Sequence, residues 1–482
     1  MLYIRINDND FFGSPLTLSV NGGIPSAFAE LSAGQKSDVR EALDSINNVS
    51  LKELEERGAI VFPSRSVENE LDDGGKIICS VQGLETDRPV VKTTNVMGFF
   101  GLTNGVQVSI RSRFDTGERQ FFLHYMLRKV CSVSPTVKLT HSEKDLFYEF
   151  IVYLFPSFLK KAVSQGLFRA YVSRDHNDAN IRGVINFPRN FRHNIPFSGN
   201  IAYRTREYSG DNSVTQLVRH TIEYIAEIKE LKNILSLDDD MEKSVQLVRG
   251  CTESYDRAAR APVINKNLRP VSHPYYTEYE PLRKLCVRIL THDRVSYGAS
   301  RHDQVNGILF DGASLWEEYL NVVLKEQMRV SKIPLLLEHP NNRTGQDRKY
   351  LFQTESRRPK AAIFPDFVLK AADGGKTAAI LDAKYKHLED AGIFREDYFQ
   401  LLSYMFRFDC NCGMLLYPYS QKDKLSDSKL YLAGHEKSVS LSVVGLDIPE
   451  YDEPDSMKDF SGRMAVSEGL FADHMESHFI SL

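Results

Sequence analysis

Residues 364–386 read FPDFVLKAADGGKTAAILDAKYK, and this stretch decides the fold of the last third of the chain. The apolar runs on either side of ADGGK predict two antiparallel strands, because aspartate and glycine accept the positive φ angles of a tight turn. Alternate side chains of a strand share a face, so Asp382 and Lys384 are expected to point the same way. Asp366 lies near the middle of the first predicted strand. The two strands can therefore bring two carboxylates and a lysine together.

Two carboxylates with a lysine beside them suit metal-assisted hydrolysis of a phosphodiester. Carboxylate oxygens are the ligands that Mg²⁺ prefers, and Mn²⁺ is the alternative cation. The metal would polarise a phosphoryl oxygen and lower the pKa of a bound water, while Lys384 orients that water or offsets developing charge. The predicted metal-binding positions are Asp366, Asp382 and Ala383. The competing interpretation is a hydrated hairpin end with an exposed ion pair, because Asp-x-Lys is a frequent pattern.

Predicted helices on both sides of this hairpin add polar side chains. LWEEYL, residues 315–320, lies on an amphipathic helix, so Glu317 or Glu318 offers a third carboxylate, and the pattern does not distinguish them. REDYFQLLSYMFRF, residues 395–408, predicts a helix in which Gln400 and Tyr404 are four residues apart and share a face. This pair could position a DNA backbone or a metal ligand. The alternatives are surface charge for the glutamates and routine packing for Gln400 and Tyr404.

The GGKT at residues 374–377 imitates the end of a phosphate-binding loop. Such a loop needs a glycine five residues before Gly375, where this chain has Lys370. It also needs a helix to follow, whereas the sequence here predicts a strand. No other such motif is found, so the chain is not expected to bind or hydrolyse a nucleotide itself.

Composition predicts a globular protein of several domains. The 482 residues are too many for one ordinary core, and 42% are hydrophobic and 26% charged. The net charge of −4 means that any binding of nucleic acid must come from a local patch. No signal peptide or membrane-spanning run is recognised, which favours a cytoplasmic protein without membrane contact. The scattered cysteines are expected to be reduced and structural: Cys79, Cys131, Cys251, Cys286, Cys410 and Cys412.

The hydrophobic patterns divide the chain into three predicted domains. Residues 1–118 alternate short β-like runs with turn signals around one helical stretch at 37–58, which favours a barrel-like or sandwich domain. Residues 119–265 are mainly helical. APVINKNLRPVSHPYY, residues 261–276, is the candidate boundary before the last domain, 266–482. The predicted fold class is therefore α+β or α/β and multidomain, with a C-terminal mixed sheet flanked by helices.

The most basic stretch of the chain lies in the middle region, at residues 168–206. It contains seven arginines but only two acidic residues, Asp175 and Asp178, and aromatic residues are interleaved with the arginines. This composition predicts contact with phosphates or with an acidic protein surface, with Arg182, Arg189 and Arg192 as candidate contacts to DNA or a partner. The alternative is a solvated strand face whose charges pair with nearby helices.

The order of these motifs resembles that of the PD-(D/E)XK nucleases: an acidic helix, Pro-Asp, Asp-x-Lys on a strand, and a helix bearing Gln-x-x-x-Tyr. More narrowly, the chain resembles the McrC family, the nuclease subunit of the McrBC modification-dependent, type IV restriction system. The resemblance covers about residues 120–445. The matching segments, in order, are IRGVINFPRNF (181–191), REYSGDNSVTQLVRHTI (206–222), LWEEYL (315–320), FPDFVL (364–369), ILDAKYK (380–386), YFQLLSYM (398–405) and LLYPY (415–419).

The resemblance implies a PD-(D/E)XK domain in which Asp366, Asp382 and Lys384 are catalytic, with Glu317, Gln400 and Tyr404 completing the predicted site. It implies an Mg²⁺-dependent DNA endonuclease for defence against foreign or modified DNA, such as DNA with 5-methylcytosine. The partner would be an AAA+ GTPase of McrB type, on which the chain docks and whose hydrolysis it stimulates. Two alternatives stay open: an adaptor whose nuclease fold serves for docking, and a stand-alone nuclease of another restriction or repair system.

Overall fold

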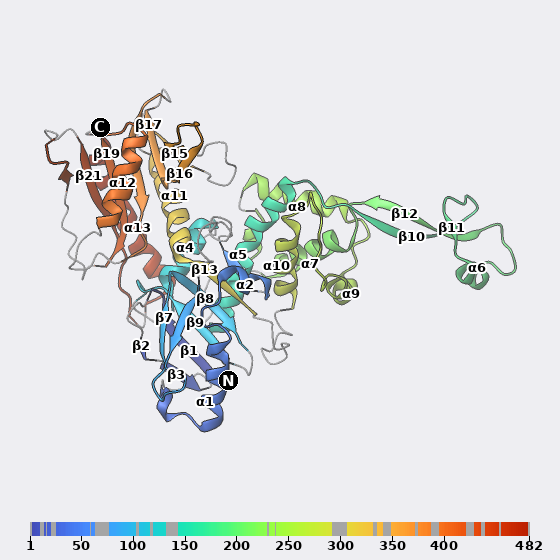
Figure 1. The fold of residues 1–482 in the computed structure, drawn as a ribbon. Helices are drawn as coiled ribbons and strands as arrows, with labels where there is room; N and C mark the ends of the chain where they lie inside the picture. Colours follow the sequence, from blue (N-terminus) through green and yellow to red (C-terminus); the bar gives the residue numbers. More distant parts are fainter. Residues whose placement is uncertain are drawn as a thin grey trace. The chain divides into compact units, whose positions relative to one another are not determined.

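The computed structural model shows a mixed α/β protein with several sheets, which confirms the predicted class at this level (Figure 1). Two compact units are present: the first unit combines Met1–Val130 with Tyr297–Leu482, and the second unit is Cys131–Ser296. The structure describes residues 2–9, 14–15, 17–20, 26–57, 59–62, 77–102, 106–115, 119–131, 143–228, 231–236, 238–291, 306–330, 335–340, 349–371, 375–386, 395–420, 429–434, 439–452 and 455–480.

The N-terminal part of the first unit is β-rich, as predicted, but consists of two sheets. The larger sheet has the order β4-β3-β1-β9-β8-β13-β5, and no pairing within the described residues closes it into a barrel. The smaller sheet has the order β2-β7-β6. The strands of the two sheets are β1 (Leu2–Asn7), β2 (Ser14–Pro15), β3 (Thr17–Val20), β4 (Ser26–Ala27), β5 (Ile60–Phe62), β6 (Cys79–Gln82), β7 (Val90–Thr93), β8 (Val96–Gly101), β9 (Val106–Arg111) and β13 (Asn306–Asp311).

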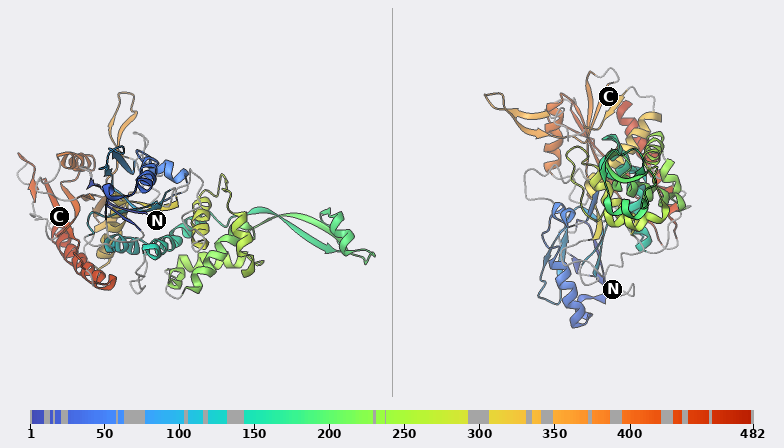
Figure 2. Two further views of the ribbon diagram at one scale, coloured as in Figure 1. Left: turned by 90° about the horizontal axis from the view of Figure 1, so that it is seen from below. Right: turned by 90° about the vertical axis from the view of Figure 1, so that its right-hand side faces the viewer.

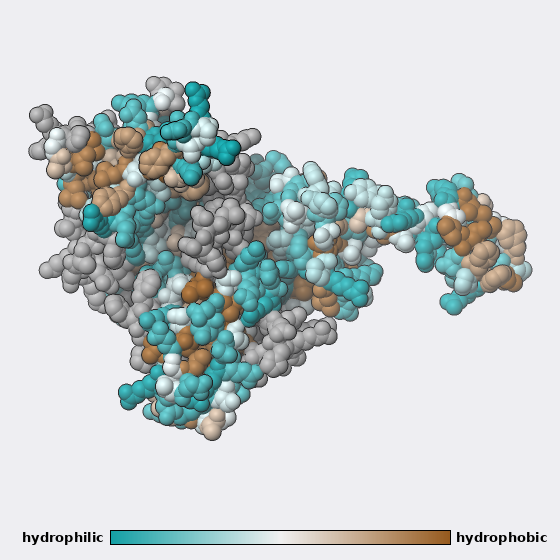
Figure 3. Space-filling model, in the orientation of Figure 1, coloured by the Kyte–Doolittle hydropathy of each residue, from teal (hydrophilic) through white to brown (hydrophobic). Residues whose placement is uncertain are grey.

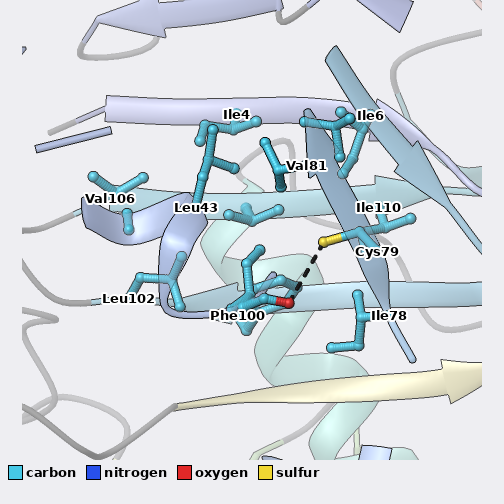
Figure 4. Packing of buried hydrophobic residues seen from close by; sticks show 14 of the residues in the cluster. Ile4, Ile6, Leu43, Ile78, Cys79, Val81, Phe100, Leu102, Val106 and Ile110 are labelled. Atoms are coloured by element: carbon cyan, nitrogen blue, oxygen red, sulfur yellow. Dashed lines mark hydrogen bonds between the residues drawn. The ribbon is translucent and has the colours of Figure 1, made fainter. Parts of the chain in front are cut away.

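The single helical stretch predicted at 37–58 is two helices, α1 (Ala33–Asp44) and α2 (Leu51–Glu56), after the short 3-10 helix η1 (Phe28–Glu30). The break follows from Ser50, whose hydroxyl accepts a hydrogen bond from the backbone N–H of Glu53 and so begins a new helix. Apolar side chains from α1 and both sheets pack together, as Figure 4 shows around Leu43 and Phe100. Within this core, burial raises the pKa of Cys79 to about 12, consistent with a structural thiol. None of the six cysteines forms a disulfide.

Strand β13 comes from far along the chain and completes the N-terminal sheet. It pairs with β8 on one side and β5 on the other. Gly98 of β8, with φ near +141°, and Gly307 of β13 let the two backbones approach so closely that a Cβ on either would overlap the other strand. The observed units are divided at other positions than the predicted boundaries at 118 and 265. The reason is that β13 belongs to the N-terminal sheet, so the C-terminal part of the chain joins the first unit.

The C-terminal part of the first unit is built around a mixed sheet of order β14-β17-β18-β19-β21-β20, beside the two-stranded ribbon β15–β16. Helices α11, α12 and α13 contact this sheet, and α4 contacts α11. The elements are α4 (Phe121–Val130), α11 (Gly312–Val330), β14 (Leu335–Glu338), β15 (Lys349–Gln353), β16 (Pro359–Ile363), β17 (Phe367–Ala371), β18 (Thr377–Ala383), α12 (Arg395–Arg407), β19 (Cys412–Tyr419), β20 (Leu430–Tyr431), β21 (Ser440–Asp447) and α13 (Met457–Ile480).

The second unit is a helical group that carries a long β-ribbon. The ribbon pairs β10 with β12, and β11 adds to β12 near α6. Two differences from the predictions are that α10 belongs to this unit and that α9 occupies part of the predicted boundary. The elements are α5 (Glu143–Ser164), β10 (Ala170–Asp178), β11 (Val184–Ile185), α6 (Phe187–His193), β12 (Ile201–Ser209), α7 (Ser213–Glu227), η3 (Lys232–Ser236), α8 (Asp239–Cys251), η4 (Arg257–Ala259), α9 (Arg260–Lys266) and α10 (Tyr279–Leu290).

Among the described helices, none has the length and apolar character needed to cross a membrane.

Candidate active site

The two predicted carboxylates meet at one end of the β17–β18 pair. The ladder ends with Phe367 opposite Leu381, so Asp366 is the next residue and lies opposite Asp382. Opposed residues of an antiparallel pair share a face. Asp366 precedes β17 and is not in the middle of a strand as predicted, because the preceding strand β16 pairs with β15 instead. Its Oδ2 accepts a hydrogen bond from the Ala383 backbone N–H at 2.6 Å, which fixes it against β18.

Lys384 and the α12 pair are brought to the same place. The Lys384 ammonium lies 2.6 Å from Oδ2 of Asp382 and donates to Oε1 of Gln400 at 2.7 Å. Gln400 Nε2 donates to the Tyr404 hydroxyl at 2.8 Å. The four-residue spacing of Gln400 and Tyr404 therefore places them on one helix face, as the sequence predicted. The backbone N–H of Lys384 donates to the carbonyl of Leu416, which ties this position to β19.

The electrostatics of the site are those of crowded, buried carboxylates. Asp382 is 2% exposed, and burial raises its pKa, opposed by Lys384. Burial, with repulsion from Glu317 and Asp382, raises the pKa of Asp366 well above its usual range. Oδ2 of Asp382 is buried and, despite the nearby ammonium, accepts no well-aligned hydrogen bond among the described atoms. A cation placed between these two carboxylates would relieve the repulsion between them.

Glu317 and Glu318 both lie close to His339, which in turn contacts Asp366. His339 was not identified as a site residue from the sequence. The His339 Nε2 lies 3.5 Å from Glu317 Oε1 and 3.8 Å from Glu318 Oε1, and its Nδ1 is 2.8 Å from the Asp366 carbonyl oxygen. Of the two glutamates, Glu317 is the one whose charge raises the pKa of Asp366. Helix α11 is held in place by Trp316, whose indole N–H donates to the Leu416 carbonyl. The signal for His339 was its place directly after an apolar strand.

A second set of charges behind Lys384 was also missed. Asp397 of α12 lies 3.6 Å from the Lys384 ammonium and 2.5 Å from that of Lys386, and the Tyr417 hydroxyl donates to it at 3.2 Å. Asp397 is buried, so these contacts fix α12 against β18 and β19. The spacing of Lys384 and Lys386 on one strand face was the available signal.

The residue after the lysine is anchored in the N-terminal part of the first unit. The Tyr385 hydroxyl lies 2.7 Å from Ser112 Oγ, and the Arg113 guanidinium stacks on the Tyr385 ring at 4.9 Å. Arg113 is itself paired with buried Asp8 at 3.0 Å. The N-terminal sheet therefore supports the backbone that carries Lys384, a role that the pattern of residues 1–118 did not reveal.

The donor set of this site fits one hard divalent cation. Among the described side chains, no three or more His, Cys, Asp and Glu residues form a ready metal cluster. Mg²⁺ does not need one, because it is held by one or two carboxylates and keeps several waters. Asp366 and Asp382 supply two carboxylates, and Ala383 has only its backbone carbonyl to offer. The Gly375–Thr377 segment leads into strand β18, whereas a phosphate-binding loop leads into a helix.

The arginines of the basic stretch lie on or beside the strands of the β10–β12 ribbon and on α6 of the second unit. Several pair within the ribbon itself and not with helices: Arg204 lies 2.9 Å from Asp175, and its hydrogen bond lowers the pKa of that carboxyl. Arg182 and Arg189 are more loosely paired, each 3.9 Å from an aspartate, Asp178 and Asp175 respectively. Arg192 on α6 is exposed, without an ion pair among the described residues.

A family model of known proteins matches the part of the chain that contains the site. The family described as McrBC 5-methylcytosine restriction system component matches residues 91–418. The chain belongs to this family. The comparison with curated proteins gave no match.

Among solved structures, McrBC-family complexes from Thermococcus gammatolerans are similar to the chain. A half-complex from a tetradecameric assembly of McrB AAA+ hexamers with bound McrC has 14% identity and a TM-score of 0.47, over 96% of this chain and 99% of that chain. The cryo-EM structure of the McrBC complex has 15% identity and a TM-score of 0.29, over 68% of this chain and 88% of that chain.

Proposed function

We propose that the chain is the DNA endonuclease subunit of an McrBC-type restriction system, dependent on Mg²⁺ or Mn²⁺ and acting with an AAA+ GTPase partner. The observation that carries this proposal is the meeting of Asp366, Asp382 and Lys384 at one end of the β17–β18 pair. Membership of the McrBC family supports it, because the family is a component of a system that restricts modified DNA. The proposals that DNA is the substrate and that the chain hydrolyses it are argued from the residues of the site.

Each residue of the site has a distinct task in this proposal. Asp366 and Asp382 would hold the divalent cation, and the Ala383 N–H keeps Asp366 oriented toward it. When bound, the cation polarises the phosphoryl group and makes water a stronger nucleophile at neutral pH. The Lys384 ammonium, fixed by Asp382 and Gln400, orients the attacking water and offsets negative charge on the phosphate. Gln400 and Tyr404 keep that ammonium in position, which makes them positioning residues.

The β10–β12 ribbon supplies a docking surface for the partner. Its tip carries a group of exposed apolar side chains, visible as brown surface at the end of the ribbon in Figure 3. Phe187 and Phe191, 61% and 60% exposed, belong to this group with Ile181, Val184, Ile195 and Phe197. Exposed apolar groups of this kind mark binding sites for proteins. A neighbouring groove of about 560 Å³ is lined in part by Arg182, Arg204 and Arg206.

Removing the charge of Lys384 tests the proposed chemistry. Lys384→Met keeps the length of the side chain, and we expect cleavage of plasmid DNA by the chain and its partner to fall about 10²-fold or more, because one preorganised charge is lost at the reacting phosphate. Addition of EDTA should stop cleavage by the wild-type chain, and Mg²⁺ should restore it. Stimulation of the partner's GTPase should not change.

The matched control is Lys370→Met, which removes a lysine of β17 that pairs with Glu338 at 2.7 Å, away from the two aspartates. This variant should cleave at the wild-type rate. Equal cleavage by Lys384→Met and the wild type would contradict the proposed role of the lysine.

A further inference from the structure

The β15–β16 ribbon is an exposed arm of the C-terminal part of the first unit. Among the described strands these two pair only with each other, and Figure 2 shows them running outward as a two-stranded ribbon. Four of the five residues of β16 are exposed, and on β15 the side chain of Phe352 is 65% exposed. Toward its tip this strand pair buries little side-chain surface, so it contributes little to a core.

The arm is basic toward its end. Between Lys349 and Ile363 the cations are Lys349, Arg357, Arg358 and Lys360, and the single acidic residue is Glu355. No ion pair to Arg357, Arg358 or Lys360 is found among the described residues, and all three side chains are exposed. This contrasts with the β10–β12 ribbon, where arginines pair with acidic groups of the same ribbon. The charge on the arm is therefore available to a ligand.

The end of the arm is a turn closed by hydrogen bonds. The Thr354 N–H donates to the Arg358 carbonyl at 2.9 Å, and the Arg357 N–H donates to the Thr354 carbonyl at 2.8 Å. The Thr354 hydroxyl accepts a further hydrogen bond from the Arg358 N–H at 3.0 Å. Arg357 has a φ of 59°, which a residue other than glycine adopts only where the surrounding bonds hold it. These contacts fix the two arginines at the outermost point of the arm.

Both strands of the arm connect to elements of the active site. Strand β16 ends at Ile363, and the chain reaches Asp366 three residues later. On β15, the Tyr350 carbonyl accepts a hydrogen bond from Arg407 Nε at 2.8 Å, and Arg407 ends α12, the helix that carries Gln400 and Tyr404. Lys349 lies 3.8 Å over the ring of Phe408. The base of the arm is therefore joined to the site, and the two arginines lie roughly 15–25 Å further out, at about 3.3 Å per strand residue.

We propose that the β15–β16 arm binds the phosphate backbone of the duplex DNA that is cut, at phosphates that lie away from the site, through the two arginines at its tip. The inference rests on the proposed endonuclease function. DNA is the occupant that fits, because it presents regularly spaced phosphates to two arginines and a lysine on one projecting ribbon. Since the net charge of the whole chain is negative, such a local patch is needed to hold an anionic substrate.

The test is binding of a labelled 40-base-pair DNA duplex by the full chain, with Ca²⁺ in place of Mg²⁺ so that binding is measured without cleavage. Arg357→Ala with Arg358→Ala should weaken binding about tenfold or more, and should lower the slope of log affinity against log salt by about one for each phosphate that is no longer neutralised. The matched control, Lys325→Ala with Arg329→Ala, removes two exposed cations from α11 and should leave affinity and slope unchanged.

Two further measurements separate this inference from the proposed function. Asp382→Asn should abolish cleavage by the otherwise unchanged chain; if cleavage persists, the proposed function fails, and the arm can still be judged by the DNA affinity of the arm variant. Unchanged DNA affinity in the arm variant overturns the inference. It is also overturned if the arm variant loses stimulation of the partner's GTPase while DNA affinity is retained, because the arm would then be a protein-binding surface.

Discussion

Asp382→Ala is expected to abolish DNA cleavage, with a loss of about 10³-fold or more in rate. The variant removes one of the two carboxylates that would hold the cation, and a metal at a phosphoryl group contributes several kcal/mol to the transition state. Docking on the partner and stimulation of its GTPase should continue at the wild-type level, because the apolar tip of the β10–β12 ribbon is unchanged. Plasmid cleavage and GTP hydrolysis measured in the same reaction check both parts.

A matched control for this variant is Asp409→Asn. Asp409 is an exposed aspartate of the same part of the chain, with a φ of 51°, and asparagine accepts such backbone angles readily. It should cleave normally. Asp382→Asn is the second catalytic variant, since it keeps the size of the side chain and guards against a simple loss of folding. Cleavage retained by both Asp382 variants would remove the basis for the proposed site.

Replacing Phe187 and Phe191 by aspartate is expected to remove stimulation of the partner's GTPase almost completely, at least about tenfold. Exposed aromatic side chains contribute much of the binding free energy of protein interfaces, and loss of two can exceed the roughly 1.4 kcal/mol that corresponds to a factor of ten. The rings lie 6.4 Å apart on α6 and are exposed, so the change should not unfold the ribbon. GTP hydrolysis by the partner, titrated with the variant, measures the effect.

The control for the ribbon replaces Leu247 and Leu268 by aspartate, two exposed apolar residues of the second unit that lie outside the ribbon. Stimulation should then match the wild type. If the ribbon variant stimulates the partner normally, the docking surface lies elsewhere. If both double variants lose stimulation equally, the effect comes from general solubility and not from the tip.

Local sequence patterns predicted the parts of the site that lie close together in the chain. The ADGGK turn, the facing of Asp382 and Lys384, and the four-residue spacing of Gln400 and Tyr404 depend only on strand and helix periodicity. The last two arrangements appear in the structure with the predicted geometry, whereas residues 372–374 of the turn lie outside the described residues. The position of Asp366 just before a strand was not predicted. It depends on the pairing of β16 with β15, and a local sequence pattern does not reveal which strands pair.

Long-range pairing limited the rest of the prediction. Strand β13 joins the N-terminal sheet between β8 and β5, so a boundary drawn from composition could not find the observed units. His339 becomes part of the site only because β14 sits beside β17 and α11. The support of Tyr385 by Ser112 and Arg113 likewise joins residues more than two hundred positions apart. A single sequence gives no sign of these contacts, since each depends on packing between separate elements.

Binding of Mn²⁺ tests most directly the central claim that Asp366 and Asp382 hold a divalent cation. The full chain, titrated with Mn²⁺ and followed by electron paramagnetic resonance of the free ion, should bind one cation that Mg²⁺ displaces. Asp366→Asn and Asp382→Asn should each lose that cation, and Asp409→Asn should keep it. Mn²⁺ binding of the same affinity and stoichiometry in the wild type and in both site variants would contradict the claim.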